Sequence, residues 1–365
     1  MPRERLSPEV FALPVERIRD GYYTDAYFNA TKQVLEAHNL HPRVLMQVFQ
    51  KHDGAVLGGM DEALAVLRLC SGRYEGEGEG RRWVPGWDQL VVHALHDGDE
   101  ISAWETVMTI EGDYGLFAHL ETVYLGVLSR RTLVSTNVRR VVEAARGKPI
   151  LFFPARFDHY RVQTGDGYAA HVAGAIGVST DAQASWWGGR GIGTVPHALI
   201  AACGGDTVEA TRRFADVHYP HMNVVALVDF DNDCVGTSLA CARALGERLW
   251  GVRLDTSETM VDRCLWERMG TFRPTGVVPE LVRAVREALD AEGFRQVRIV
   301  VSGGFDAEKI RRFEEMGVPA DAYGVGSSLL RGENDFTADV VMVDGRPCAK
   351  KGRAYRPNPR LERVT

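Results

Sequence analysis

Two patterns of hydrophobic and polar residues divide the chain. Residues 88–112 alternate apolar and polar side chains around an Asp-Gly-Asp sequence, a pattern typical of short antiparallel strands with one solvated face. Segments 27–40 and 59–70 instead carry apolar residues at helical spacing. Residues 119–147 predict two long helices joined near Ser135, and the Gly- and charge-rich segment 72–83 predicts an exposed loop, either a lid or a plain solvated loop.

From residue 149 onward the pattern changes to apolar runs separated by amphipathic helices such as 207–219 and 278–293. Buried parallel strands with helical crossovers are typical of this rhythm. The predicted fold is therefore α/β, an irregular α/β barrel (119–336) beside an N-terminal β-rich α/β domain (1–118). The tail 337–365 is expected to fold back onto that domain. The predicted barrel strands are 149–153, 223–230, 249–255, 297–304 and 321–327.

Composition narrows the class of protein. The 365 residues are 45% hydrophobic and 25% charged with a formal net charge of −6, which argues against a general nucleic-acid binder. No run of 18 apolar residues occurs and the first 20 residues are charged throughout, so neither a membrane anchor nor a signal peptide is expected. The six cysteines form no CxxC pair. We therefore expect a cytoplasmic protein with reduced thiols.

Two glycine-rich segments follow the last two predicted strands. Their backbone N–H groups could converge on a phosphate without interference from a Cβ, although tight turns alone would also explain the glycines. Because late strands of α/β barrels often hold phosphate at their carboxyl ends, we favour a phosphate cradle. The first glycine turn is Ser302, Gly303 and Gly304, and the second is Gly324, Gly326 and Ser327.

Acidic residues follow two neighbouring strands. Carboxylates at strand ends could hold a hydrated Mg²⁺ that bridges to substrate oxygens, whereas helix capping is the alternative. Arg253, just inside the barrel mouth, requires an acidic partner or an anionic ligand, so a structural Arg–Asp pair is a second possibility. The residues are Asp229, Asp231 and Asp233 after the first strand, and Arg253, Asp255 and Glu258 at the next.

Three further residues suit a flat anionic ligand. Phe153 and Arg156 stand three residues apart at the end of the first barrel strand, where a ring could stack on Phe153 while Arg156 pairs with a carboxylate or phosphate. Taken alone, Phe153 could equally be a core residue. His197 opens a helix after a Gly-rich segment and could contact phosphate or transfer a proton, or be an ordinary loop histidine.

Six motifs occurring in order resemble nicotinate phosphoribosyltransferase, a type II phosphoribosyltransferase family that includes the nicotinamide and quinolinate enzymes. They span roughly residues 20 to 350 and read GYYTDAYF, LSRRTLVSTNVRRVVEAARGKPILFFPAR, GIGTVPHALIAA, GVRLDTSE, VSGGFDAEKI and AYGVGSSLL. The resemblance implies a homodimer or larger assembly with shared sites. It also implies transfer of phosphoribose from 5-phosphoribosyl-1-pyrophosphate to nicotinate, with Mg²⁺ and with ATP as a possible co-substrate.

The resemblance also implies roles for individual residues. Tyr27, contributed by the partner subunit, and Phe153 would stack on the two faces of the pyridine. Asp25 belongs to the same N-terminal motif as Tyr27. Arg156 would hold the carboxylate or amide of the ring and neighbouring phosphates. His197 would be the phosphorylated histidine of ATP coupling. Arg253 and Asp255 would contact ribose and pyrophosphate, and Asp229 would contact ribose or Mg²⁺. Asp229 and Asp255 would be the metal ligands. Both glycine turns would hold the 5′-phosphate.

One residue departs from the nicotinate pattern. Asp181 stands where nicotinamide enzymes place an Asp that accepts from the carboxamide, and a carboxylate there would repel nicotinate. Nicotinamide is therefore the alternative substrate, whereas quinolinate would need a larger basic cluster. An aldolase-like barrel would need a Schiff-base lysine in its mouth, but Lys148 precedes a strand and Lys309 lies in a predicted helix. A non-catalytic phosphoribosyl- or nucleotide-binding protein is the remaining alternative.

Overall fold

The computed structural model describes residues 4–76 and 78–365 and forms two compact units. The first unit comprises residues 1–136 and 332–365, and the second comprises residues 137–331. The division falls within helix α4 (Glu121–Ala144), whereas the sequence pattern places it before this helix. No helix among the described residues is long and apolar enough to cross a membrane.

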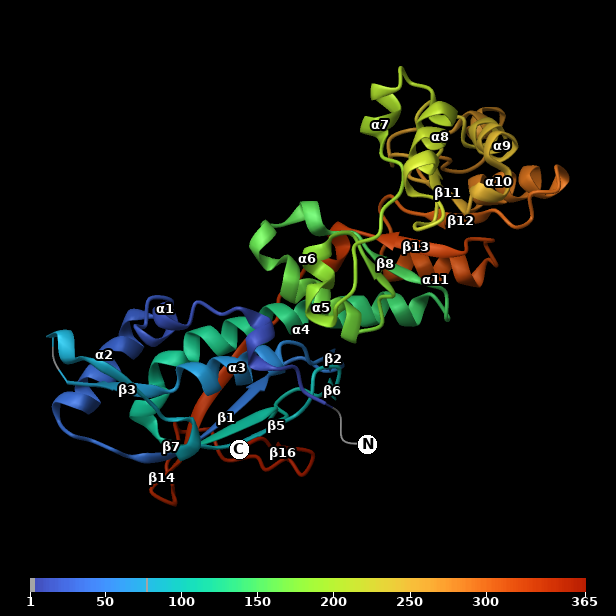
Figure 1. Ribbon diagram of the computed structural model, residues 1–365. Helices are drawn as coiled ribbons and strands as arrows, with labels where there is room; N and C mark the ends of the chain where they lie inside the picture. Colours follow the sequence, from blue (N-terminus) through green and yellow to red (C-terminus); the bar gives the residue numbers. More distant parts are fainter. Residues whose placement is uncertain (1–3, 77) are drawn as a thin grey trace. The chain divides into compact units, whose positions relative to one another are not determined.

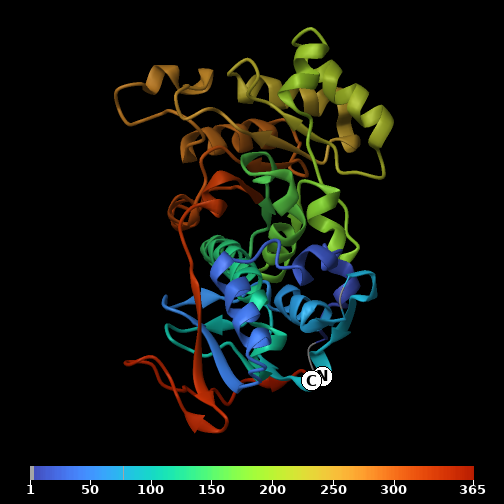
Figure 2. The ribbon, with the colours of Figure 1, turned by 90° about the vertical axis from the view of Figure 1, so that its left-hand side faces the viewer.

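An antiparallel six-stranded sheet organises the first unit, in the order β15-β14-β1-β7-β5-β16. Strand β14 pairs with β1 along seven residues of each strand, so the C-terminal tail folds back onto the N-terminal layer as predicted. This pairing of the red and blue ends of the chain can be followed in Figure 2. The strands are β1 (Arg43–Gln50), β5 (Val91–Ala94), β7 (Met108–Asp113), β14 (Phe336–Val343), β15 (Arg346–Pro347) and β16 (Glu362–Arg363).

Helices supply the other half of the core of the first unit. Helix α3 (Met60–Cys70) buries nearly its whole length, and α4 contributes the fully buried Tyr124 and Leu128 to the same apolar cluster as β1 and β7. The helices predicted from periodicity are confirmed as α2 (Ala26–Ala37) and α3, which follow the short α1 (Val15–Arg19).

Two predictions for this region are wrong. Residues 121–144 form one helix, because the Ser135 hydroxyl donates to Val56 O and to Arg131 O (3.0 Å) and so fits inside the helix without breaking it. The predicted exposed loop is largely a hairpin of β3 (Gly72–Glu75) and β4 (Arg82–Pro85), stabilised by the cross-strand ring pair Tyr74–Trp83 at 4.8 Å. Residue 77 of that segment lies outside the described residues. A second small pair joins β2 (Ala55–Val56) to β6 (Glu100–Ile101).

A parallel six-stranded sheet organises the second unit, in the order β10-β11-β12-β13-β8-β9 (Figure 1). All five predicted strands are confirmed, and β9, only two residues long, is an addition. The strands are β8 (Ile150–Phe152), β9 (Gly177–Val178), β10 (Val225–Leu227), β11 (Gly251–Leu254), β12 (Arg298–Val301) and β13 (Ala322–Val325). The helices are α5 (Gln163–Val172), α6 (Asp181–Ala184), α7 (His197–Ala202), α8 (Thr207–His218), α9 (Cys234–Leu245), α10 (Pro279–Ala291) and α11 (Ala307–Glu315).

An extended segment links the two edge strands of this sheet. Ile192 N donates to Val178 O of β9 at 2.8 Å, and Val195 N donates to Val225 O of β10 at 3.1 Å. The sheet is therefore a half-barrel whose open side is bridged by residues 192–195 rather than by a regular strand. This arrangement is the physical form of the irregular barrel that the sequence predicts.

Candidate active site

The polar residues singled out in the second unit lie at the carboxyl ends of its strands. Asp229 follows β10, Asp255 follows β11, and Ser302 follows β12. Because neighbouring parallel strands end at the same edge of a sheet, the fold brings these residues together.

Arg253 is the centre of a hydrogen-bonded network at this edge. Its Nε donates to Ser302 Oγ (2.8 Å), Nη1 to Thr194 Oγ1 (3.1 Å) and Nη2 to Asp255 Oδ2 (2.8 Å). The Ser302 hydroxyl in turn donates to Asp255 Oδ1 at 2.7 Å. The Arg–Asp pair considered from sequence is present, and about a fifth of the Arg253 side chain stays accessible, 20%. The network therefore fixes a guanidinium that can still meet an anion.

Sequence reasoning missed Thr194. It belongs to the segment that bridges the open side of the half-barrel, and its hydroxyl is one of the three partners of Arg253. Its place three residues before His197 was the available signal, since both lie in the motif GIGTVPHALIAA.

His197 and Asp229 form a second pair. His197 Nε2 lies 3.1 Å from Asp229 Oδ1, with the His197 side chain 46% exposed and the Asp229 side chain 7% exposed. Burial raises the pKa of Asp229, and the nearby charge of Asp255 adds to this effect, while His197 opposes it. An exposed imidazole held by a buried carboxylate can act as an oriented proton carrier or nucleophile.

Asp229 and Asp255 are also the residues expected to bind Mg²⁺. Among residues 4–76 and 78–365, no group of three or more His, Cys, Asp or Glu side chains is arranged to hold a metal ion. Asp229 and Asp255 are nevertheless close enough for the charge of one to raise the pKa of the other. A cation would relieve that repulsion, and Mg²⁺ commonly takes one or two carboxylates and completes its shell with water and substrate oxygens. The two residues fit such an ion.

The first glycine turn has a backbone that favours glycine. Gly303 and Gly304 have φ of +83° and +66°, the left-handed region in which other residues are strained. Lys309 Nζ donates to Gly303 O at 3.1 Å. Within the described residues, the backbone N–H groups of Gly303 and Gly304 have no hydrogen-bond partner in the protein. Two unpaired amides at a turn are suited to an anion.

The second glycine turn has a different cause. Neither Gly324 nor Gly326 has a positive φ. A Cβ on Gly324 would lie 2.9 Å from the Phe153 ring, and one on Gly326 would lie 2.9 Å from the Phe157 ring. These glycines make room for two aromatic rings, which gives them a packing role whatever else they bind. Ser327 opens the short 3₁₀ turn Ser327–Leu330.

Phe153 and Arg156 each take part in a cation–π contact. The Arg253 guanidinium lies 5.6 Å from the centre of the Phe153 ring, and Arg156 lies 5.5 Å from that of Phe157. The structure thus joins Phe153 to the Arg253 network and adds Phe157, which the sequence analysis did not single out.

The other predicted site residues have local partners. Asp181 Oδ1 accepts from Gly191 N at 2.8 Å, and Asp233 caps α9 by accepting from Gly236 N at 3.0 Å. In the first unit Asp25 precedes α2 and its Oδ2 accepts from Thr122 Oγ1 at 2.9 Å. Tyr27 is 63% exposed. Capping thus accounts for Asp233, as the alternative reading of the acids anticipates.

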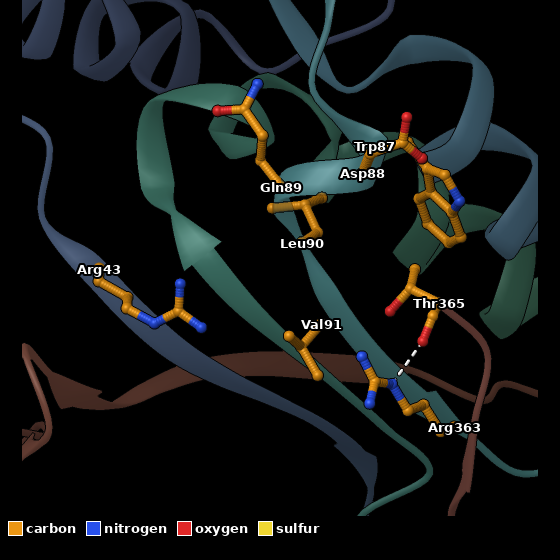
Figure 3. A pocket seen from close by; sticks show the side chains of 8 residues that line it. All are labelled: Arg43, Trp87, Asp88, Gln89, Leu90, Val91, Arg363 and Thr365. Carbon is orange, nitrogen blue, oxygen red and sulfur yellow. Dashed lines mark hydrogen bonds between the residues drawn. The ribbon is translucent and has the colours of Figure 1, made fainter.

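A hollow of about 370 Å³ lies in the first unit, at the end of β5. Figure 3 shows its lining, which includes Arg43, Trp87 and Arg363, with Arg363 Nε donating to Thr365 O at 2.5 Å. Arg43 also pairs with Glu111 at 2.9 Å. None of the predicted site residues lines this hollow, so it takes no part in the site.

Comparison with known proteins shows the family of the chain. Residues 25–132 match the family described as quinolinate phosphoribosyl transferase, N-terminal domain. A crystal structure of nicotinate-nucleotide pyrophosphorylase from Pyrococcus furiosus is 32% identical with a TM-score of 0.79, covering 96% of this chain and 85% of that one. Human nicotinic acid phosphoribosyltransferase shares the fold at 17% identity and a TM-score of 0.63, covering 89% of this chain and 75% of that one.

The fold is therefore that of a phosphoribosyltransferase class. The chain belongs to the type II phosphoribosyltransferase family. A nicotinate phosphoribosyltransferase of Mycobacterium tuberculosis is 30% identical over 297 residues, which is 79% of this chain and 57% of that protein. The chain thus spans a little over half the length of the curated relatives that it matches.

Proposed function

We propose that the chain transfers the 5-phosphoribosyl group from 5-phosphoribosyl-1-pyrophosphate to nicotinate, giving nicotinate mononucleotide and pyrophosphate for NAD biosynthesis. The network of Arg253, Asp255 and Ser302 at the strand ends carries the proposal. The name of the Mycobacterium relative specifies nicotinate as the acceptor, whereas the name of the Pyrococcus relative specifies the nicotinate nucleotide alone.

The chemistry needs positioning more than acid–base catalysis. The bond between ribose C1 and the pyrophosphate oxygen breaks, and its electron pair leaves with pyrophosphate. The pyridine nitrogen supplies its own lone pair to the new N–C1 bond, so no general base is needed. Arg253 would stabilise the leaving charge, and the carboxylates of Asp229 and Asp255 would stabilise the electron-poor sugar.

Mg²⁺ is part of the proposal, with Asp229 and Asp255 as its protein ligands. When bound, the ion would neutralise charge on the pyrophosphate oxygens. Phe153, whose ring lies 5.6 Å from the Arg253 guanidinium, is the candidate to stack on the pyridine, and Arg156 is the candidate for its carboxylate.

Three further features belong to the proposal. ATP would raise the yield by phosphorylating His197, whose exposed ring is oriented by Asp229. A second subunit would supply Tyr27, which is largely exposed in the single chain. The protein would act in the cytoplasm as a homodimer or larger assembly.

The alternative acceptor is nicotinamide, which rests on Asp181. The Asp181 carboxylate already accepts from the backbone of Gly191, and this contact favours a local structural role over recognition of a carboxamide. Nicotinate is therefore the preferred acceptor.

Pyrophosphate release from 5-phosphoribosyl-1-pyrophosphate and Mg²⁺ tests the proposal, with nicotinate, nicotinamide and quinolinate in parallel, each with and without ATP. We expect release with nicotinate. Release with nicotinamide alone would make Asp181 the specificity residue. No pyrophosphate release with any acceptor would favour a non-catalytic binding protein. His197→Ala should abolish stimulation by ATP and spare the basal reaction, and an unchanged response to ATP would contradict the role of His197.

A further inference from the structure

The first glycine turn lies against a carboxylate that the proposed reaction does not use. A Cβ on Gly304 would collide with Glu258 Oε1, so this oxygen sits directly over the Gly304 Cα. Asp255 lies against the other glycine, since a Cβ on Gly303 would be 3.5 Å from Asp255 Oδ1. The turn is therefore flanked by two carboxylates, one at each glycine.

The two carboxylates are held very differently. Asp255 accepts from Arg253 and from Ser302. Within residues 4–76 and 78–365, the carboxylate of Glu258 takes part in no hydrogen bond or ion pair. Its contact with Gly304 is therefore one of van der Waals packing, and no directional bond fixes it there.

The turn presents the amide donor of Gly304 on the side away from Lys309. Lys309 Nζ binds Gly303 O at 3.1 Å and lies 4.3 Å from the centre of the Phe305 ring. In a trans peptide the C=O and the following N–H point in opposite directions. Fixing the Gly303 carbonyl toward Lys309 thus directs the unpaired Gly304 N–H the other way, where an incoming phosphate can accept from it.

Glu258 also borders a hollow with an excess of positive groups. This hollow, about 370 Å³, lies between α11 and the segment that joins β11 to α10. Its charged lining consists of Arg273, Lys309 and Arg312 against Glu258 and Glu280. Burial lowers the pKa of Lys309, and the charge of Glu258 partly opposes this shift. The hollow can accept the Glu258 carboxylate without leaving it unpaired.

We propose that Glu258 is an internal anion that covers the first glycine turn in the free chain and moves into this cationic hollow when a phosphate monoester binds. Glu258 would then set the affinity of the site for the 5′-phosphate, because a phosphate dianion bound at the turn and the carboxylate packed on Gly304 repel each other. This inference rests on the proposed function, which assigns the turn to the phosphate of the substrate.

Calorimetric titration with ribose 5-phosphate at low ionic strength tests the inference without turnover. We expect Glu258→Gln to lower the Kd about three- to tenfold, an advantage that shrinks in 0.5 M salt. Glu280→Gln is the matched control, since it removes a carboxylate from the same hollow but not from the turn, and should change the Kd less than about twofold. In turnover, Glu258→Gln should lower the KM for 5-phosphoribosyl-1-pyrophosphate by a larger factor than it changes kcat.

The outcomes separate the inference from the proposed function. An unchanged or raised Kd for Glu258→Gln, in a wild-type chain that binds ribose 5-phosphate and turns over, overturns the inference alone. An equal gain from Glu280→Gln also overturns it, because the effect would be one of net charge. Tighter binding without turnover by any variant supports the inference and contradicts the enzyme. Failure of every variant to bind ribose 5-phosphate contradicts both.

Discussion

The two glycine turns at the ends of β12 and β13 look alike in sequence and differ in cause. Gly303 and Gly304 occupy the left-handed region and face carboxylates. Gly324 and Gly326 have no positive φ and face the rings of Phe153 and Phe157. Gly326, at φ −114° and ψ −115°, nevertheless lies outside the α and β regions. The first turn therefore needs glycine for its backbone conformation, Gly324 needs it for space, and Gly326 needs it for both.

This difference bears on what each turn contributes to the site. In the first turn the backbone conformation leaves two N–H groups without a protein partner among the described residues. In the second turn the missing side chains let the Phe153 ring lie under Arg253. The N–H groups of Gly326 and Ser327 in the second turn also have no hydrogen-bond partner among the described residues, so both turns are suited to a phosphate, and the second also places the ring and the guanidinium beside it.

The largest expected effect comes from the side chain that touches both turns. Arg253 donates to Ser302 of the first turn and covers the Phe153 ring that packs on the second. Arg253→Ala should lower kcat/KM by about 10²–10³, the range for loss of one preorganised charge-stabilising donor. Steady-state pyrophosphate release measures this change.

The control for that variant is Arg263→Ala. Arg263 is 67% exposed and lies 3.6 Å from Asp233, outside the network of Arg253, so its removal should leave turnover within about twofold of wild type. Near-wild-type turnover of Arg253→Ala with an intact fold would remove Arg253 from the active site.

Gly304→Ala tests the backbone requirement of the first turn. The new Cβ would collide with Glu258, and an alanine at φ +66° is strained by roughly 1–2 kcal/mol. Adding Glu258→Ala should relieve the collision and leave the strain, so the double variant should stay destabilised by about 1 kcal/mol. Urea unfolding measures both. Full recovery in the double variant would mean that space, and not conformation, dictates glycine here.

Gly324→Ala tests the space requirement of the second turn. Its Cβ would press on the Phe153 ring at 2.9 Å and on Ser302 Cβ at 3.3 Å, and overpacking of this kind costs about 1–3 kcal/mol. Because no backbone strain is involved, Phe153→Leu in the same chain should recover much of the loss. A double-mutant cycle should give a coupling of about 1 kcal/mol, and a coupling near zero would contradict the packing explanation.

The sequence was sufficient to predict the helices and strands whose hydrophobic periodicity is clear. It was also sufficient to predict which polar residues lie at the ends of strands. The five buried runs became neighbouring strands, which brought Asp229, Asp255 and Ser302 to one edge. It was insufficient where a tertiary contact decides, as for Ser135, whose bond to Val56 lets one helix continue. Thr194 was missed for the same reason, since its role depends on residues 192–195 bridging the two edge strands.

The smallest expected effect comes from Asp181, whose hydrogen-bond partner Gly191 lies in a third glycine-rich segment. Asp181 accepts from Gly191 N at 2.8 Å, and a Cβ on Gly191 would lie 2.7 Å from the Thr180 carbonyl carbon, so glycine is again required for space. Asp181→Ser removes one exposed hydrogen bond, worth about 0.5–1 kcal/mol, and competition between nicotinate and nicotinamide should shift by less than about threefold.

A tenfold gain in nicotinate preference would instead place the Asp181 carboxylate at the pyridine, as the resemblance to nicotinamide enzymes implies. Asp181→Asn separates the two accounts further. An asparagine keeps an oxygen acceptor for Gly191 N and removes the negative charge, so it should match wild type in stability. A change in acceptor preference caused by Asp181→Asn must then arise from a charge that faces the substrate. A preference equal to that of the wild type would mean that Asp181 acts only in the local turn.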